Sequence, residues 1–137
     1  MTTYELNMSS NPDEVSKVID WLDYATTDKP ISEEHRLQFR YALVEAINNC
    51  IEHAYDSQPG RPIRLVCETS EQSVSVTIHD QGNPYTSSDN HATHHALTDE
   101  SGRGLAIINA WVSSFQISHS NGWNITRLVR EIDTNHD

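Results

Sequence analysis

The stretch Glu45-Ala-Ile-Asn-Asn-Cys-Ile-Glu-His-Ala-Tyr55 places a carboxylate, two amides and an imidazole inside a segment with the apolar spacing of a buried helix. Glu45, Asn49 and His53 recur every four residues, which puts them on one helix face. A carboxylate followed one turn later by a neutral amide suits a Mg²⁺ ion that keeps most of its waters. The stretch predicts that Asn49 binds the metal and Glu45 moves a proton. A solvated helix face without function is the alternative that this motif alone leaves open.

Composition excludes several classes of function. The 137 residues are expected to form a single domain, residues 1–137, around one core. No apolar run approaches the roughly 18–20 residues that cross a bilayer, and the first residues resemble no export signal, so we expect a cytoplasmic protein without a membrane partner. The net charge of −11 argues against direct binding of nucleic acid, because phosphate contacts need clustered cations. Cys50 and Cys67 lack the CxxC spacing and are expected to be buried, reduced thiols.

The first half of the chain is expected to form an edge strand and two helices. Residues 3–8 alternate apolar and polar side chains with the period of a half-buried strand. Asn11, followed by proline and then by Glu14, predicts a capped helix start. Ser32 is expected to cap a second helix that runs to about Tyr55. The predicted core stripe of this helix consists of Leu37, Tyr41, Val44, Ile47 and Ile51.

The second half of the chain is expected to complete a sheet. Residues 85–101 have almost no apolar content or period, and we interpret this loop as a lid. The element order predicts an α+β fold, a two-layer sandwich with helices on one face of a mixed, mainly antiparallel sheet. The opposite sheet face is expected to stay partly exposed. The other predicted elements are strands 63–69 and 73–80, a helix from residue 104, and a hairpin of Phe115–His119 and Trp123–Ile132 around an Asn121-Gly122 turn.

The segment Asp80-Gln-Gly-Asn-Pro84 follows the end of a predicted strand. Asp80 is therefore expected to point its carboxylate into the space between sheet and helices. Gly82 permits a backbone conformation that a side chain would resist. A carboxylate accepts hydrogen bonds well from donors such as the exocyclic amine of adenine. An Asp-x-Gly turn without a ligand remains the alternative.

The segment Ser101-Gly-Arg-Gly-Leu105 directly precedes a predicted helix. Free backbone N–H groups and the helix dipole attract anions there, and the glycines allow phosphate oxygens to approach. Arg103 adds a positive charge. The alternative is a capping turn with a solvated arginine.

Glu-x-x-x-Asn on a helix, Asp-x-Gly after a strand and Gly-x-Gly before a helix occur here in one order. This order resembles the GHKL superfamily of ATP-binding domains and, within it, the RsbW-like family of anti-sigma-factor serine/threonine kinases, over roughly residues 10–132. Pro84 departs from the superfamily's broad pattern, in which a second glycine follows. The resemblance implies Glu45 as general base, Asn49 as Mg²⁺ ligand, Asp80 and Gly82 at the adenine, Gly102, Arg103 and Gly104 at the phosphates, and Thr126 near the adenine.

The resemblance also implies a function. It is that of an ATP- and Mg²⁺-dependent kinase that phosphorylates a serine on an STAS-domain anti-anti-sigma factor, forms a homodimer and sequesters a sigma factor. A non-catalytic binding module that holds a regulatory protein is the first alternative. An ATPase without a protein substrate is the second.

Overall fold

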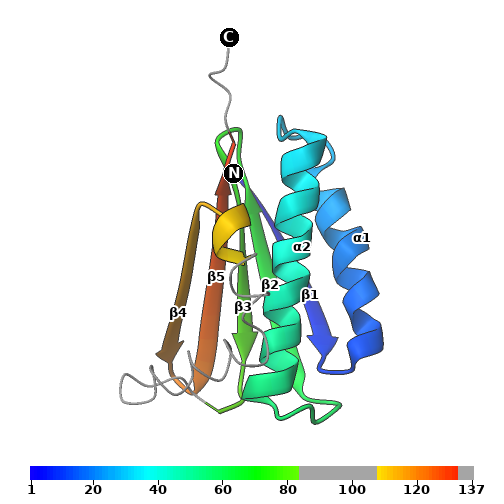
Figure 1. Cartoon of the computed structure of the whole chain (residues 1–137), viewed down its shortest axis with the longest axis vertical. Helices are drawn as coiled ribbons and strands as arrows, with labels where there is room; N and C mark the ends of the chain where they lie inside the picture. The colour runs from blue at the N-terminus through cyan, green and yellow to red at the C-terminus, as the bar shows by residue number, and fades with distance from the viewer. Residues whose placement is uncertain (84–107, 133–137) are drawn as a thin grey trace.

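A computed structural model describes residues 1–83 and 108–132. It shows a five-stranded sheet in the order β1-β2-β3-β5-β4, with both long helices on one face (Figure 1). Every strand pairing in the described part is antiparallel. The α+β sandwich predicted from the sequence is thus confirmed. The elements are β1 (Thr2–Ser9), the 3-10 helix η1 (Pro12–Glu14), α1 (Val15–Thr26), α2 (Glu33–Asn49), the π-helical turn η2 (Cys50–Ala54), β2 (Pro62–Thr69), β3 (Ser73–Asp80), β4 (Ser114–Ser120) and β5 (Trp123–Glu131).

The predicted strands and turns agree with this arrangement. β1 lies at one edge of the sheet and β4 at the other. The hairpin of β4 and β5 turns at Asn121 and Gly122, whose φ angles of 55° and 83° match the left-handed conformation of a tight hairpin turn. Residues 108–111 are helical, whereas 104–107 and the expected lid lie outside the described residues. No helix in the described part is both long and apolar enough to span a membrane.

Two cross-strand rows on the helix-facing side of the sheet position the site. Successive side chains of a strand point to opposite faces, so residues two apart share a face. The first row, at one end of the sheet, is Met8, Ile63, Asp80, Asn124 and His119. The second row is Leu6, Leu65, Ile78, Thr126 and Ile117. Three polar residues thus stand next to one another on three adjacent strands, and Thr126 lies one row further along.

The core lies between this face and the helices. Its largest fully buried side chains come from both layers, which buries a continuous apolar surface and supplies the main stabilisation of the fold. Val74, Val76 and Ile78 of β3 are all completely buried. These core side chains include Val18 and Leu22 of α1, Phe39, Leu43 and Ile47 of α2, and Leu65, Val74, Val76, Ile78 and Leu128 of the sheet.

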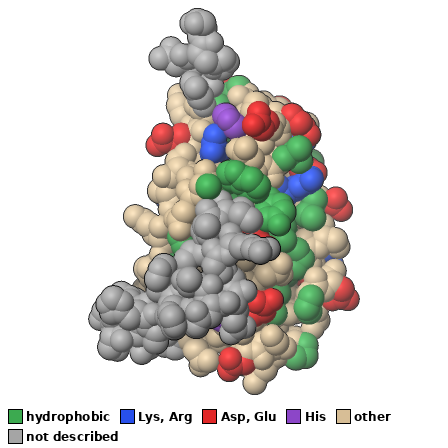
Figure 2. Space-filling model, viewed as in Figure 1, with side chains coloured by type: hydrophobic (Ala, Val, Ile, Leu, Met, Phe, Trp, Pro, Cys, Tyr) green, Lys and Arg blue, Asp and Glu red, His purple; other side chains and the backbone are tan. Residues whose placement is uncertain are grey.

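The predicted core stripe of α2 is wrong in its first half. Leu37 and Tyr41 are 39% and 51% exposed, and hydrophobic side chains are visible on this side of the molecule in Figure 2. Ile47 and Ile51 are buried, as predicted. The helix is apolar around much of its circumference, so the spacing of large side chains did not identify the face that packs on the sheet. That face consists of Phe39, Ala42, Leu43, Ala46 and Ile47.

The start of the helical layer also differs from the prediction. Asn11 precedes η1, but its side chain makes no capping hydrogen bond and instead accepts one from Gly60 N at 3.2 Å. The Glu14 carboxylate accepts hydrogen bonds from Ser9 N at 3.1 Å and Ser9 Oγ at 2.5 Å. At α2 the prediction is confirmed, because Ser32 Oγ accepts a hydrogen bond from the backbone N–H of the third helical residue at 3.1 Å.

The carboxyl end of α2 widens into η2 before the chain turns to β2. Tyr55 N donates to Cys50 O at 3.1 Å, a five-residue step that replaces the usual four. The Tyr55 hydroxyl donates to Pro62 O and accepts from Gln81 N, both at 2.6 Å. These two bonds fix the end of the helix to the start of β2 and to the residue after β3.

Gly82 meets the end of η2 at very close range. A Cβ atom built on Gly82 would lie 2.3 Å from Ala54 O and 2.8 Å from Ala54 Cβ. Asn83 N donates to the same carbonyl oxygen at 2.8 Å. The φ angle of Gly82 is not among the positive ones. The requirement for glycine is therefore the close approach of two backbones, and not the special conformation that the sequence suggested.

We predict that Gly82→Ala destabilises the fold. The new methyl group would overlap a backbone carbonyl that cannot move without displacing η2, so we expect a loss of about 1–3 kcal/mol or more. The free energy of unfolding in urea measures this loss. Gln81→Ala, at the exposed neighbouring position, should stay within about 0.5 kcal/mol of wild type. Equal stability of the two variants would contradict the close approach of Gly82 to Ala54.

We also predict a pH-dependent contribution from Glu14. Its two hydrogen bonds from Ser9 lower the pKa of the carboxyl from 4.5 to about 2. A lowered pKa means that the carboxylate stabilises the fold fully above pH 4.5 and that this contribution is lost as the pH falls towards 2. Glu14→Gln should therefore flatten the dependence of stability on pH within that window, as measured by urea unfolding at several pH values. An unchanged dependence would show that the Ser9 bonds are absent in solution.

Candidate functional site

Asp80 is the centre of the candidate site. Its side chain is completely buried on the helix-facing side of the sheet, in the place expected from the sequence. Oδ1 accepts hydrogen bonds from Gly82 N and Asn124 Nδ2, both at 2.8 Å, and Oδ2 accepts one from Cys50 Sγ at 2.7 Å. A buried carboxylate is costly unless hydrogen bonds replace its hydration. Donors from the following loop, β5 and η2 supply that replacement.

Cys50 acts in this site as a neutral donor. Its burial raises the pKa of the thiol well above the usual value, and the adjacent carboxylate of Asp80 raises it further. The thiol therefore keeps its proton and can donate it to Oδ2. Cys67 is likewise a free, buried thiol, with a pKa raised to about 12 by burial. The expectation of two buried, unpaired thiols is confirmed.

Asn124 is a site residue that the sequence analysis missed. It is completely buried on β5, directly opposite Asp80. Besides its bond to Asp80, Nδ2 donates to Gly82 O at 3.3 Å and to Asn83 O at 3.1 Å. Its Oδ1 lies 3.0 Å from His119 Nδ1. Asparagine is disfavoured in strands, so its presence at an inward position of a strand was a usable sign of a polar site.

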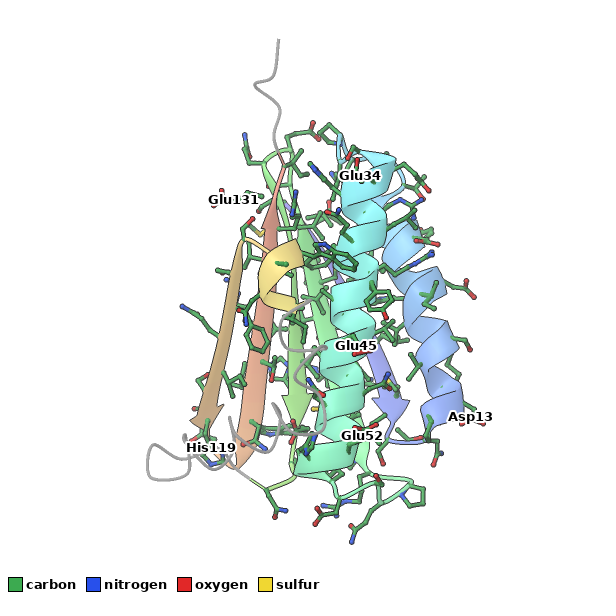
Figure 3. All side chains as sticks on the ribbon, in the orientation of Figure 1. Asp13, Glu34, Glu45, Glu52, His119 and Glu131 are labelled. Atoms are coloured by element: carbon green, nitrogen blue, oxygen red, sulfur yellow. The ribbon has the colours of Figure 1, made fainter. Side chains whose placement is uncertain are left out.

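The predicted row on α2 and η2 lies on the same helical segment as Cys50. Glu45, Asn49 and His53 are all half-buried, and Asn49 directly precedes the cysteine that contacts Asp80. Glu45 lies in the second half of α2, and Figure 3 shows Glu52 and His119 nearer the end of the molecule where β3 also ends. Within the described ranges, no hydrogen bond or ion pair engages the side chains of Glu45 and Asn49. No described residue therefore occupies their oxygen atoms.

These residues fit a nucleotide and its metal ion. His53 Nε2 is a buried atom with no hydrogen-bond partner among the described residues, which leaves a polar group ready to meet a ligand. A carboxylate and an amide that supply oxygen atoms are a suitable donor set for Mg²⁺. Thr126 is 7% exposed in the sheet row next to Asp80. Gly102, Arg103 and Gly104 lie outside the described residues, as does Pro84.

Comparison with known proteins places the chain in a family. Residues 8–130 match the family described as histidine kinase-like ATPase domain. No curated protein matches the sequence. Among solved structures, the RsbU and RsbW domains of Rv1364c from Mycobacterium tuberculosis align with a TM-score of 0.69 and 16% identity. That alignment covers 96% of this chain and 33% of the other.

Two histidine kinases have the same fold. The blue-light activated histidine kinase EL346 from Erythrobacter litoralis aligns with a TM-score of 0.56 and 12% identity, over 88% of this chain and 60% of the other. The Acinetobacter baumannii histidine kinase AdeS aligns with a TM-score of 0.55 and 15% identity, over 98% of this chain and 70% of the other. The chain thus spans a third of the Rv1364c structure and over half of each kinase structure.

These findings confirm the resemblance to the GHKL superfamily that the three motifs indicated. Membership of an ATPase family implies ATP binding, and the kinase-like fold is shared with all three structures. Because the family match extends over most of the chain, this protein belongs to the histidine kinase-like ATPase domain family.

Proposed function

We propose that this protein is a serine/threonine protein kinase that transfers the γ-phosphate of Mg-ATP to a serine of an STAS-domain protein. One observation carries the proposal: the Cys50–Asp80 hydrogen bond joins the helical segment that contains Glu45, Asn49 and His53 to the buried carboxylate at the end of β3. In this proposal, Asp80 recognises the base, Asn49 binds the metal and Glu45 accepts the proton. The likeness to a structure that contains an RsbW domain supports the partner-switching class.

Each residue has a chemical role in this proposal. Asp80 accepts a hydrogen bond from the amino group of adenine, and Thr126 lies beside the base. Asn49 holds Mg²⁺, which when bound neutralises phosphate charge. Glu45 is the general base, because it is a carboxylate that no described side chain engages. Gly102, Arg103 and Gly104 are proposed to hold the phosphates through backbone N–H groups and the guanidinium.

The transfer itself requires mainly positioning. The serine oxygen forms a bond to the γ-phosphorus while the bond from this phosphorus to the bridging oxygen breaks, and ADP leaves. Glu45 takes the hydroxyl proton of the serine. The Nε2 atom of His53 is buried without a partner in the described part of the chain, and in this proposal it donates or accepts a hydrogen bond at the nucleotide.

The partners follow from the same proposal. The substrate is an STAS-domain anti-anti-sigma protein, and a sigma factor is the protein sequestered when that substrate is phosphorylated. Two copies of the chain act together as a homodimer in the cytoplasm. The net charge of −11 and the prevalence of acidic over basic side chains on the surface in Figure 2 agree with a protein partner and with the absence of nucleic acid from the proposal.

Asp80→Asn tests nucleotide binding. Replacing the carboxylate by an amide weakens the acceptor and places an NH₂ group among donors, so affinity for Mg-ADP should fall about tenfold or more in titration calorimetry. Asp56→Asn, at an exposed position of positive φ that asparagine tolerates, is the matched control and should bind like wild type. Equal affinity of the two variants would remove Asp80 from nucleotide recognition.

Glu45→Gln tests catalysis. The amide cannot accept the serine proton, so phosphate transfer to the STAS protein should fall by about 100-fold or more, while the affinity for Mg-ATP stays close to wild type. Radiolabel transfer from ATP and calorimetry measure the two quantities. Glu52→Gln, on an exposed side of η2, controls for loss of charge nearby. Undiminished labelling by Glu45→Gln would contradict its role as general base.

A further inference from the structure

The acceptor capacity of Asp80 is nearly filled by the protein itself. A carboxylate offers about four lone-pair positions, about two on each oxygen. Gly82 N and Asn124 Nδ2 occupy both positions of Oδ1, and Cys50 Sγ occupies one position of Oδ2. Counting donors from residues 1–83 and 108–132, this leaves one position on Oδ2. A ligand that reaches Asp80 can therefore satisfy it with a single N–H donor.

Asn124 has a fixed amide orientation. Its Nδ2 faces the Asp80 carboxylate and the carbonyl oxygens of Gly82 and Asn83. The flipped amide would place Oδ1 against those three acceptors, which is unfavourable for a buried group. His119 Nδ1 lies 3.0 Å from the remaining Oδ1 and can donate to it. The amide can thus accept a hydrogen bond from β4, and it donates hydrogen bonds to Asp80 and to the loop after β3.

Cys50 holds the other carboxylate oxygen. The thiol lies on η2, whereas Asn124 lies on β5. Asp80 therefore accepts hydrogen bonds from the helical layer and from the sheet. Rotation of the carboxylate would break at least one of these bonds at a buried side chain, where a lost hydrogen bond is costly. The open position of Oδ2 consequently has a fixed direction.

We propose that Asn124 and Cys50 are positioning residues that leave Asp80 one acceptor position, and that they thereby make the site selective for a nucleobase with an exocyclic amino group. This inference rests on the nucleotide-binding part of the proposed function and adds residues to it. Neither residue needs to touch the nucleotide. Their effect is on how strongly Asp80 distinguishes a base with an amine from the same base without one.

The experiment compares two nucleotides that differ only at that amine. Affinities for Mg-ATP and for Mg-purine riboside triphosphate, in which hydrogen replaces the amino group, are measured by calorimetry for each protein. Their ratio reports the Asp80–amine hydrogen bond, and a purely structural defect weakens both ligands without changing it. The variants are Asn124→Leu, Cys50→Ala and Cys50→Ser. Serine retains a donor at nearly the size of alanine, so this pair separates hydrogen bonding from packing.

Wild type should prefer ATP by about tenfold or more, since a hydrogen bond to a charged group has that worth. The ratio should fall towards one in Asn124→Leu and several-fold in Cys50→Ala, and Cys50→Ser should restore it. A wild-type ratio near one, or wild-type ratios in Cys50→Ala and Asn124→Leu, would overturn the inference. If Asn124→Leu does not fold, the two Cys50 variants decide.

A separate assay tests the proposed kinase function. Phosphate transfer to the STAS protein is assayed with the same wild-type preparation. If the affinity ratio changes in the variants as predicted but no phosphate is transferred, the positioning roles of Asn124 and Cys50 are supported and the proposed kinase activity is refuted. If phosphate is transferred but the affinity ratio is the same in the variants as in wild type, the kinase activity is supported and the positioning roles are refuted.

Discussion

The arrangement of the candidate site depends on the burial of one side chain, that of Asp80. Asp80 is completely enclosed, and a buried carboxylate persists only where donors surround it. Those donors come from three separate parts of the chain, namely η2, the loop after β3 and β5. Hydrogen bonds to this one side chain therefore connect β3 with β5 in the sheet and with η2 at the end of α2. The same hydrogen bonds join η2, which begins at Cys50, to the end of β3.

The close contact at Gly82 serves the same arrangement. The loop after β3 can donate to Asp80 because Gly82 allows it to pass against Ala54 without a side chain. Tyr55 then joins the end of the helix to both β2 and the residue after Asp80. The wide turn of η2 is located where these contacts converge. Irregular helical turns of this kind are frequent at functional sites, in agreement with the proposed nucleotide site.

Much of the fold could be predicted from local pattern. The β-strands alternate clearly, the Asn121-Gly122 turn has a distinctive composition, and Ser32 is a standard helix cap, so these elements were expected correctly. The core stripe of α2 was predicted incorrectly in its first half, because the alanines that pack on the sheet contribute little to a pattern based on large apolar residues. Asn11 and Glu14 were paired as a cap, but distant backbone groups at Gly60 and Ser9 compete for their side chains.

The candidate site divides in a similar way. Asp80 and Gly82 were predicted as site residues because a strand end followed by Asp-x-Gly is a local motif, although the reason for glycine is a contact that only the folded chain contains. Asn124 was missed because its partner is 44 residues away in sequence and is met only through the register of β3 and β5. The roles of Glu45 and Asn49 came from spacing and resemblance and stay predictions; both side chains are half-buried.

The most direct test is a crystal structure of the protein with Mg²⁺ and a non-hydrolysable ATP analogue. The account predicts one nucleotide whose adenine amine donates to Asp80 Oδ2, with Mg²⁺ bound to the amide oxygen of Asn49 and the γ-phosphate facing Glu45. A nucleotide bound elsewhere, with Asp80 contacting only Gly82, Asn124 and Cys50, would contradict it.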